Sequence, residues 1–169
     1  MIRPAADEYA PYYATYVDKV PGDDVLGVLE SGIGETRGLL EELGEARGDH
    51  RYAEGKWSVK EVVGHLVDAE RTFALRALAF ARCDPEEFPS HDQEIYVTNG
   101  AFGSRTVSSL SEELASVRGS TLTLFRGFAD DVWGRRGRAS GCEFTVRAMP
   151  FIIAGHELHH RAVLADRYS

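Results

Sequence analysis

The feature that most restricts the fold of this chain is a set of four segments in which apolar residues recur every three or four positions. This spacing is typical of an α-helix that buries one face. Strand patterns are nearly absent, and only short pieces such as residues 143–146 alternate at all. The sequence therefore predicts an all-α fold, a four-helix bundle. The four segments run over about Asp23–Glu45, Ser58–Arg82, Ser109–Phe128 and Thr145–Arg167.

No repeat, low-complexity tract or linker divides the 169 residues, so we expect residues 1–169 to form a single domain. The connection between the second and third predicted helices, Asp84–Ser108, is long for a bundle. A connection of that length can return along the bundle, which lets the two helices that it joins lie parallel. We therefore expect an up-down-down-up order of helices.

Short patterns mark where individual helices are expected to begin. Ser58 and Glu61 form a capping box, in which each side chain satisfies a free backbone N–H of the other residue. Ser109 and Glu112 repeat this pattern, which predicts that the third helix opens there. Pro150 falls in an early turn of the fourth segment, where a proline costs least.

Charge and cysteine content exclude several classes of protein. The chain has 19 lysine and arginine residues against 27 aspartate and glutamate residues, a net charge of −8. An acidic chain repels phosphate backbones, so no nucleic-acid partner is expected. The longest apolar run, Ala148–Gly155, is too short to cross a bilayer, so no membrane partner is expected. Cys83 and Cys142 make neither a disulfide framework nor a CxxC site, and the first residues lack a signal-peptide pattern, so we expect a soluble cytoplasmic protein.

The most informative residues for function are His156 and His160, near the end of the fourth helix. On an ideal helix they point about 40° apart, on the same side as apolar residues such as Ile152 and Ile153. Two imidazoles one turn apart on an apolar face can bind one metal ion. The alternative is a pair of core histidines satisfied by hydrogen bonds.

The same residues match the zinc-protease pattern H-E-x-x-H from His156 to His160. In the common protease families a third ligand lies downstream of this motif. Only nine residues follow His160, and Val163 and Asp166 occupy the positions of the metzincin glycine and histidine. Glu157 also points about 100° from His156, toward the flank of the helix. The protease interpretation is therefore rejected.

A third ligand has to come from upstream, and His65 on the second helix is the best candidate. It belongs to a polar stripe beside the apolar one, and this stripe either lines a cavity between helices or forms a solvated face. Glu61 and Asp68 of the stripe, and His159 beside the pair, are candidate partners for a ligand imidazole. The stripe consists of Glu61, His65, Asp68, Thr72 and Arg76.

Other residues near these motifs allow two interpretations each. Arg76 or Arg147 either binds an anionic cosubstrate or forms a surface salt bridge. His50 and His91 lie in predicted loops, and we expect them at the surface. The tyrosine-rich start of the chain is expected to pack across the bundle, with a ligand role as the alternative.

Two of these motifs resemble the DinB/YfiT-like superfamily of metal-binding four-helix bundles. They are Lys56–Arg71, with Trp57-Ser58 followed by His65, and Ile153–Arg161, with His156-x-x-x-His160. The tyrosine-rich start, Val117-Arg118, residues 145–148 and residues 91–94 support the match. The resemblance implies an up-down-down-up bundle, frequent homodimers, and a divalent ion, often zinc or nickel, on three histidines. On this chain those histidines are His65, His156 and His160.

The resemblance implies less about the reaction. Some members of the family are named metal-dependent hydrolases without a known substrate, and others use low-molecular-weight thiols such as bacillithiol or mycothiol. Three imidazoles leave one position of a tetrahedral ion open, as in catalytic sites. Such an ion acidifies a water for hydrolysis or a thiol for S-transfer. The alternative is a non-catalytic bundle that binds metal or a small ligand.

Overall fold

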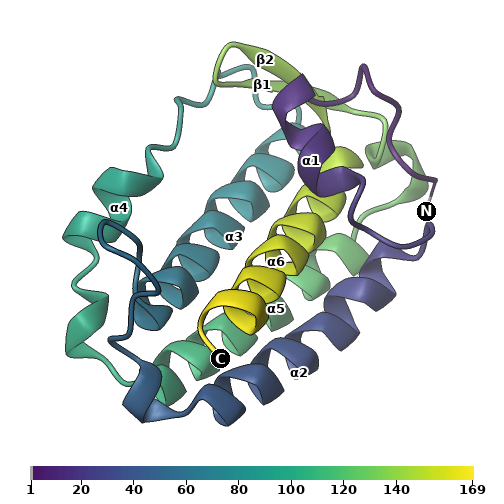
Figure 1. The fold of residues 1–169 in the computed structure, drawn as a ribbon. Helices are drawn as coiled ribbons and strands as arrows, with labels where there is room; N and C mark the ends of the chain where they lie inside the picture. Colours follow the sequence, from purple (N-terminus) through teal and green to yellow (C-terminus); the bar gives the residue numbers. More distant parts are fainter. Residues whose placement is uncertain (1) are drawn as a thin grey trace.

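The computed structural model describes residues 2–169, and four long helices dominate it (Figure 1). They are α2 (Val25–Leu43), α3 (Val59–Ala81), α5 (Val107–Arg126) and α6 (Ala148–Arg167). The all-α four-helix bundle predicted from the apolar spacing is confirmed. None of the helices formed by residues 2–169 combines the length and the apolar character that crossing a bilayer requires.

Each long helix packs against two others. The α2 and α3 helices both lie against α5 and α6. One apolar cluster joins the first halves of α3 and α5 to the second halves of α2 and α6, and a second cluster joins the opposite halves. Hence α3 and α5 begin at the same end of the bundle, and α2 and α6 begin at the other (Figure 1).

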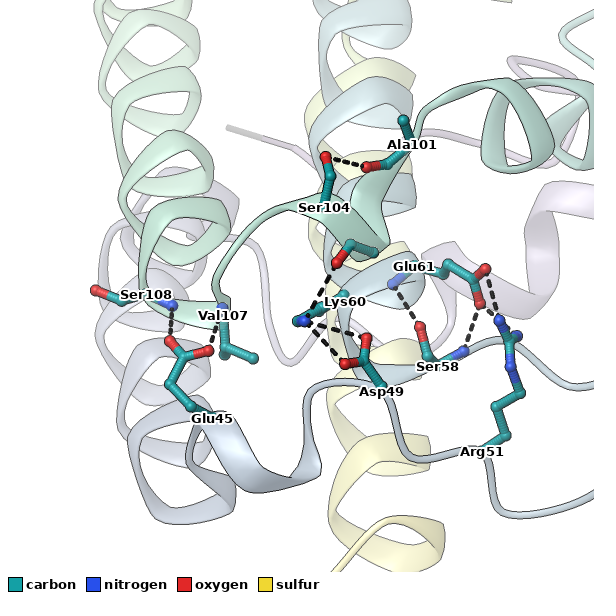
Figure 2. Close-up of polar contacts among 11 residues, drawn as sticks. Glu45, Asp49, Arg51, Ser58, Lys60, Glu61, Ala101, Ser104, Val107 and Ser108 are labelled. Carbon is teal, nitrogen blue, oxygen red and sulfur yellow. Dashed lines mark hydrogen bonds and ion pairs between the residues drawn. The ribbon is translucent and has the colours of Figure 1, made fainter.

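The capping box predicted at the start of α3 is present. The Ser58 hydroxyl accepts a hydrogen bond from the Glu61 N–H at 3.3 Å, and the Glu61 carboxylate accepts one from the Ser58 N–H at 2.6 Å (Figure 2). Arg51 binds the same carboxylate from the preceding loop. The cap therefore fixes both where α3 begins and where Glu61 points.

The predicted start of the third helix at Ser109 is wrong, because α5 begins two residues earlier, at Val107. Its N-cap is Thr106, whose hydroxyl accepts a hydrogen bond from the Ser109 N–H at 3.0 Å. The Glu45 carboxylate, which follows α2, accepts hydrogen bonds from Val107 N–H and Ser108 N–H at 2.9 Å each (Figure 2). The Glu45 carboxylate thus satisfies two N–H groups in the first turn of α5. A capping box at Ser109 would leave these two groups without a partner.

The start of α6 also differs from the prediction, because the helix begins at Ala148 and Thr145 is the last residue of a strand. Strands β1 (Arg136–Ala139) and β2 (Cys142–Thr145) pair antiparallel through a turn with positive φ at Ser140 and Gly141. Pro150 lies in the first turn of α6, as expected. The hairpin covers one end of the bundle, next to the last turns of α3 (Figure 1).

Two short segments lie over the long helices. The connection from α3 to α5 carries α4 (Gln93–Asn99) and a 3-10 turn, Phe102–Ser104, and both pack against α3. Near the N-terminus, a 3-10 turn (Pro11–Tyr13) leads into α1 (Ala14–Val17), which lies along α6. The approach is close, because a Cβ at Gly155 would stand 1.9 Å from the Tyr16 carbonyl oxygen. The tyrosine-rich start therefore packs across the bundle as expected.

Candidate metal centre

Three histidines from two helices converge in the interior of the bundle. His65 comes from α3, while His156 and His160 come from successive turns of α6. Their candidate ligand nitrogens all lie within 4.8 Å of one another, and His65 Nε2 is 2.9 Å from His156 Nε2. The α3–α6 packing thus brings together the three residues that the sequence singled out as metal ligands.

Burial keeps these three side chains neutral. His65 and His156 are buried and His160 is half-buried. Burial, with a smaller contribution from neighbouring histidines, lowers the pKa of His65 to about 4 and the pKa of His160 to about 3. Burial, followed by four neighbouring histidines, also holds the pKa of His156 well below its ordinary value. Neutral imidazoles have the free lone pairs that a cation requires.

The donor set fits a divalent ion better than it fits a set of hydrogen-bonded core histidines. The facing Nε2 atoms of His65 and His156 can share one proton only if the two rings adopt opposite tautomers. The other ring nitrogen of His65, Nδ1, is buried with no hydrogen-bond partner among residues 2–169. A divalent ion would accept the lone pairs of all three imidazoles at once, and zinc favours nitrogen donors of this kind.

Aromatic rings enclose the histidines on several sides. The Tyr16 ring stands edge-on to His156 with centroids 5.2 Å apart, and the Trp57 ring is 4.8 Å from the His65 ring. The Phe73 ring lies 6.4 Å from that of His156. These rings shield the imidazoles from water and limit their motion.

Two cavities large enough to hold a small molecule adjoin the histidine cluster. The first, of about 240 Å³, is lined by His65 and His156 together with Tyr13, Tyr16, Arg76 and His91. The second, of about 270 Å³, is lined by His159 and His160 together with Lys56, Trp57 and Tyr168. Gln93 of α4 lines both. A small molecule in either cavity would therefore reach the cluster.

The predicted partners of the ligand imidazoles lie in different surroundings. The hydrogen bonds of Glu61 go to Ser58 and Arg51, so its carboxylate serves the helix cap. Asp68 is half-buried, and its carboxylate lies 4.0 Å from Arg71. Since His65 Nδ1 has no partner, neither carboxylate bonds to it in this structure. His159 stands beside the cluster, with its ring centroid 5.0 Å from that of His160.

The expectation that His91 lies at the surface is wrong. Its loop folds back over α3, where the Arg76 guanidinium donates to the Pro89 carbonyl oxygen at 2.7 Å. His91 is half-buried as a result, and its Nε2 has no hydrogen-bond partner in residues 2–169. The sequence places His91 in a loop, but only the long-range contact reveals that this loop closes over the site.

A buried ionic network that the sequence pattern did not predict lies behind the cluster. The Arg118 guanidinium binds the Glu70 carboxylate through two hydrogen bonds of 2.8 and 2.9 Å, and it lies 2.8 Å from Glu157. Glu157 also accepts a hydrogen bond of 2.6 Å from the Thr36 hydroxyl. The available signal was Arg118 itself, which stands four residues after Leu114 and eight after Leu110, on the apolar face of its helix.

The comparisons with known proteins agree on the fold. A sequence model of the DinB superfamily matches residues 29–164, more than half of the chain. No curated protein matches the sequence. Among solved structures, YfiT from Bacillus subtilis, described as a probable metal-dependent hydrolase with an unusual four-helix bundle topology, is 19% identical with a TM-score of 0.73. The match covers 98% of this chain and 90% of YfiT.

Two further structures are similar. The mycothiol-dependent maleylpyruvate isomerase is 11% identical with a TM-score of 0.70, and the match covers 86% of this chain but only 61% of that one. A DinB-like protein from Bacillus subtilis, YjoA, is 19% identical with a TM-score of 0.58, over 83% of this chain and 86% of that one. Identities this low establish a shared fold and leave the reaction open.

Proposed function

The chain belongs to the DinB superfamily, and from that premise we propose that it is a metal-dependent enzyme acting on a small-molecule substrate. A divalent ion, zinc or nickel, would be held by His65, His156 and His160. The observation that carries the proposal is the convergence of these three side chains, with ligand nitrogens within 4.8 Å of one another, beside two cavities. We take residues 1–169 as one domain of this kind.

The proposed reaction is hydrolysis or transfer to or from a low-molecular-weight thiol. When bound, the ion would act as a Lewis acid that acidifies the water or thiol at its open position. The description of YfiT as a probable metal-dependent hydrolase supports the first reaction, and the mycothiol-dependent isomerase supports the second.

The chain's own residues would bind and shield the reacting groups. The three imidazoles are neutral at pH 7, so they attract a cation and do not repel it. The Tyr16 and Phe73 rings beside His156 would form apolar walls of the first cavity. His159 lines the second cavity beside His160, where it is a candidate partner for substrate.

A non-catalytic protein that binds metal or a small ligand is the second candidate. The observation that favours it is the distribution of carboxylates, since Glu61 and Glu157 are both engaged by arginines. Neither is free to act as a general base toward a group at the cluster.

Metal analysis followed by an activity panel tests the proposal. Purified protein should contain one divalent ion per chain, and His65→Ala should remove it. Turnover of an ester, amide or thiol-transfer substrate that is lost on chelation and restored by metal supports an enzyme. Stoichiometric metal with no turnover across the panel supports the binding protein, and wild-type protein that binds no divalent ion overturns the metal-dependent enzyme and the metal-binding protein alike.

We further propose that the protein is a cytoplasmic homodimer with two-fold symmetry. The exposed Leu75 and Leu78 on α3 are apolar side chains that a second copy would bury. The exposed free thiol of Cys83 suits a reducing compartment. Light scattering that finds only an 18.7 kDa species would contradict the dimer.

A further inference from the structure

The cavity in front of His65 and His156 contains one cationic side chain, that of Arg76. Arg76 follows His65 by eleven residues on α3, so the two residues share a face of the helix to within about 20°. Ala69 and Phe73 lie between them on the same face and line the same cavity. Arg76 is only 3% exposed, so its guanidinium is largely withdrawn from bulk water.

Arg76 differs from the other buried cations in having no counter-ion. Within residues 2–169 the buried cationic side chains are Lys60, Arg76 and Arg118. Lys60 lies 3.0 Å from the Asp49 carboxylate, and Arg118 is bound by two carboxylates. No described carboxylate lies within 4.0 Å of the Arg76 guanidinium. Burying an unpaired charge costs several kcal/mol, so buried arginines are normally paired.

The contacts that Arg76 does make leave part of its guanidinium unused. One Nη donates to the Pro89 carbonyl oxygen at 2.7 Å, and the Phe73 ring centroid lies 5.8 Å from the central guanidinium carbon. Nε of Arg76 is buried and has no hydrogen-bond partner in the described part of the chain. A second nitrogen from a residue lining this cavity, Nε2 of His91, is also buried without a partner.

The other polar groups that line the cavity are neutral. Burial raises the pKa of Tyr13, and the nearby Arg76 guanidinium only partly offsets this effect. Burial, with a smaller contribution from Arg76, lowers the pKa of His91. Tyr13 and His91 are thus uncharged at pH 7, and neither supplies the negative charge that Arg76 lacks.

We propose that the substrate carries a carboxylate that binds Arg76 in this cavity, while its reacting group lies at His65 and His156. A carboxylate has two oxygens, so it can accept hydrogen bonds from both unpartnered nitrogens, Arg76 Nε and His91 Nε2. The cavity of about 240 Å³ lies below the usual range of about 300–1,000 Å³ for drug-sized ligands, so the acid is small. Only the placement of the reacting group rests on the proposed function.

A test that does not depend on metal uses butyrate and butyramide, which share a shape and differ in charge. In NMR titrations of the metal-free protein, butyrate should bind about ten- to a hundredfold more tightly than butyramide, as expected for hydrogen bonds to a charged group. Arg76→Gln should remove this preference. Arg71→Gln is the matched control on α3, because Arg71 is half exposed and already paired with Glu113, and it should leave the preference unchanged.

A second measurement needs no variant, in case Arg76→Gln does not fold. The Arg76 Nε–Hε signal of the wild-type protein should shift with butyrate and stay in place with butyramide. A signal that does not move at saturating butyrate overturns the proposal. So does a preference for butyrate that persists in a folded Arg76→Gln protein.

A third measurement separates this inference from the proposed function. In zinc-loaded protein, 3-mercaptopropionate should bind about tenfold or more better than 3-mercaptopropionamide, and Arg76→Gln should remove the difference without changing zinc content. If the protein binds no metal but still prefers butyrate through Arg76, the proposed function fails and the carboxylate subsite stands. If zinc binds but the protein prefers neither butyrate over butyramide nor 3-mercaptopropionate over 3-mercaptopropionamide, the carboxylate subsite is overturned and the metal site stands.

Discussion

The Glu157 carboxylate lies 2.8 Å from the Arg118 guanidinium at the centre of the bundle, one residue beyond His156. Both side chains are almost fully buried, and Arg118 also binds Glu70 and the Leu29 carbonyl oxygen. Arg118 therefore links α2, α3, α5 and α6 directly behind the histidine cluster. Two carboxylates and one guanidinium leave a net charge of −1 next to a candidate cation site, which favours a bound cation.

Arg118→Met should be strongly destabilising, because it leaves Glu70 and Glu157 buried without their partner. We expect a loss of about 3–5 kcal/mol in the free energy of unfolding, measured by denaturant titration. Arg126→Met is the control, since Arg126 lies on the same helix and forms an exposed pair with Glu30. It should change stability by about 0.5 kcal/mol or less. Equal stability of the two variants would refute a structural role for the Arg118 network.

Glu157→Gln should keep the metal. The carboxylate is occupied by Arg118 and Thr36, and an amide of the same shape can still accept a hydrogen bond. We expect metal content to be unchanged after dialysis against a weak chelator, with a loss of about 1–3 kcal/mol in stability. Any activity that the protein has should not fall as it does when a protease loses its general base. Metal loss in a folded Glu157→Gln protein would place Glu157 in the binding site.

Substitutions in the adjacent histidines should separate ligand from neighbour. His156→Ala and His160→Ala should each abolish tight metal binding, because two imidazoles hold a divalent ion weakly. His159→Ala should retain the ion, since His159 points about 100° from His160 on the helix. The His159→Ala substitution should instead reduce activity or modestly lower the stability of the protein. Metal content per chain in the three variants tests which histidines are ligands. If His159→Ala loses the ion while His160→Ala keeps it, then His159 is the ligand and His160 is its neighbour.

The sequence predicted the parts of the molecule that depend on local spacing. The apolar periods placed the four long helices, and the Ser58–Glu61 box is set by residues three positions apart. His156 and His160 could be assigned to one face for the same reason. His65 could be predicted as the third ligand because it lies on a polar stripe that borders the core stripe of a second helix.

Most of the features that the sequence missed depend on contacts between residues far apart in the chain. Glu45 accepts hydrogen bonds at the start of α5 from 62 residues away, in addition to the local cap by Thr106. The Arg118–Glu157 pair joins different helices, and His91 reaches the cavity only because its loop folds over α3. Each of these side chains could also lie in solvent, so its spacing in the sequence could not show whether it makes the contact or faces water.

Gly155→Ala tests the close approach of α1 to α6. A Cβ there would stand 1.9 Å from the Tyr16 carbonyl oxygen, and a backbone atom cannot move aside as a flexible side chain can. We expect a loss of about 1–3 kcal/mol in denaturant unfolding and displacement of the Tyr16 ring from His156. Gly119→Ala on α5 is the control, because nothing lies within 4 Å of its added Cβ. That substitution should be neutral or stabilising by up to about 1 kcal/mol, and an equally tolerated Gly155→Ala would contradict the packing.

The N-terminal segment that carries the tyrosines should loosen in acid because Glu8 anchors it. The Glu8 carboxylate accepts hydrogen bonds from Arg147 at 2.7 and 3.0 Å and from the Thr145 hydroxyl at 2.8 Å. Burial alone would raise the pKa of Glu8, but the bonds from Arg147 and Thr145 outweigh it and hold the pKa below its ordinary value of 4.5. As the pH falls, the unfolded chain therefore takes up this proton before the folded protein does.

The sign of the pH dependence follows from that difference in pKa. The stabilisation from Glu8 is fully present above pH 4.5 and is lost as the pH falls through the lower pKa of the folded state. Glu8→Gln should cost about 1–3 kcal/mol at pH 7, and the gap from wild type should shrink below pH 4.5. Denaturant unfolding of metal-free protein from pH 7 down to about pH 3 measures this gap, spanning the range over which carboxylates titrate.

Glu143→Gln is the control. Glu143 is in an exposed pair with Arg136, and the substitution should show almost no gap in stability from wild type at any pH. A Glu8→Gln gap that stays constant to the lowest pH would show that the carboxylate charge does not hold the segment in place.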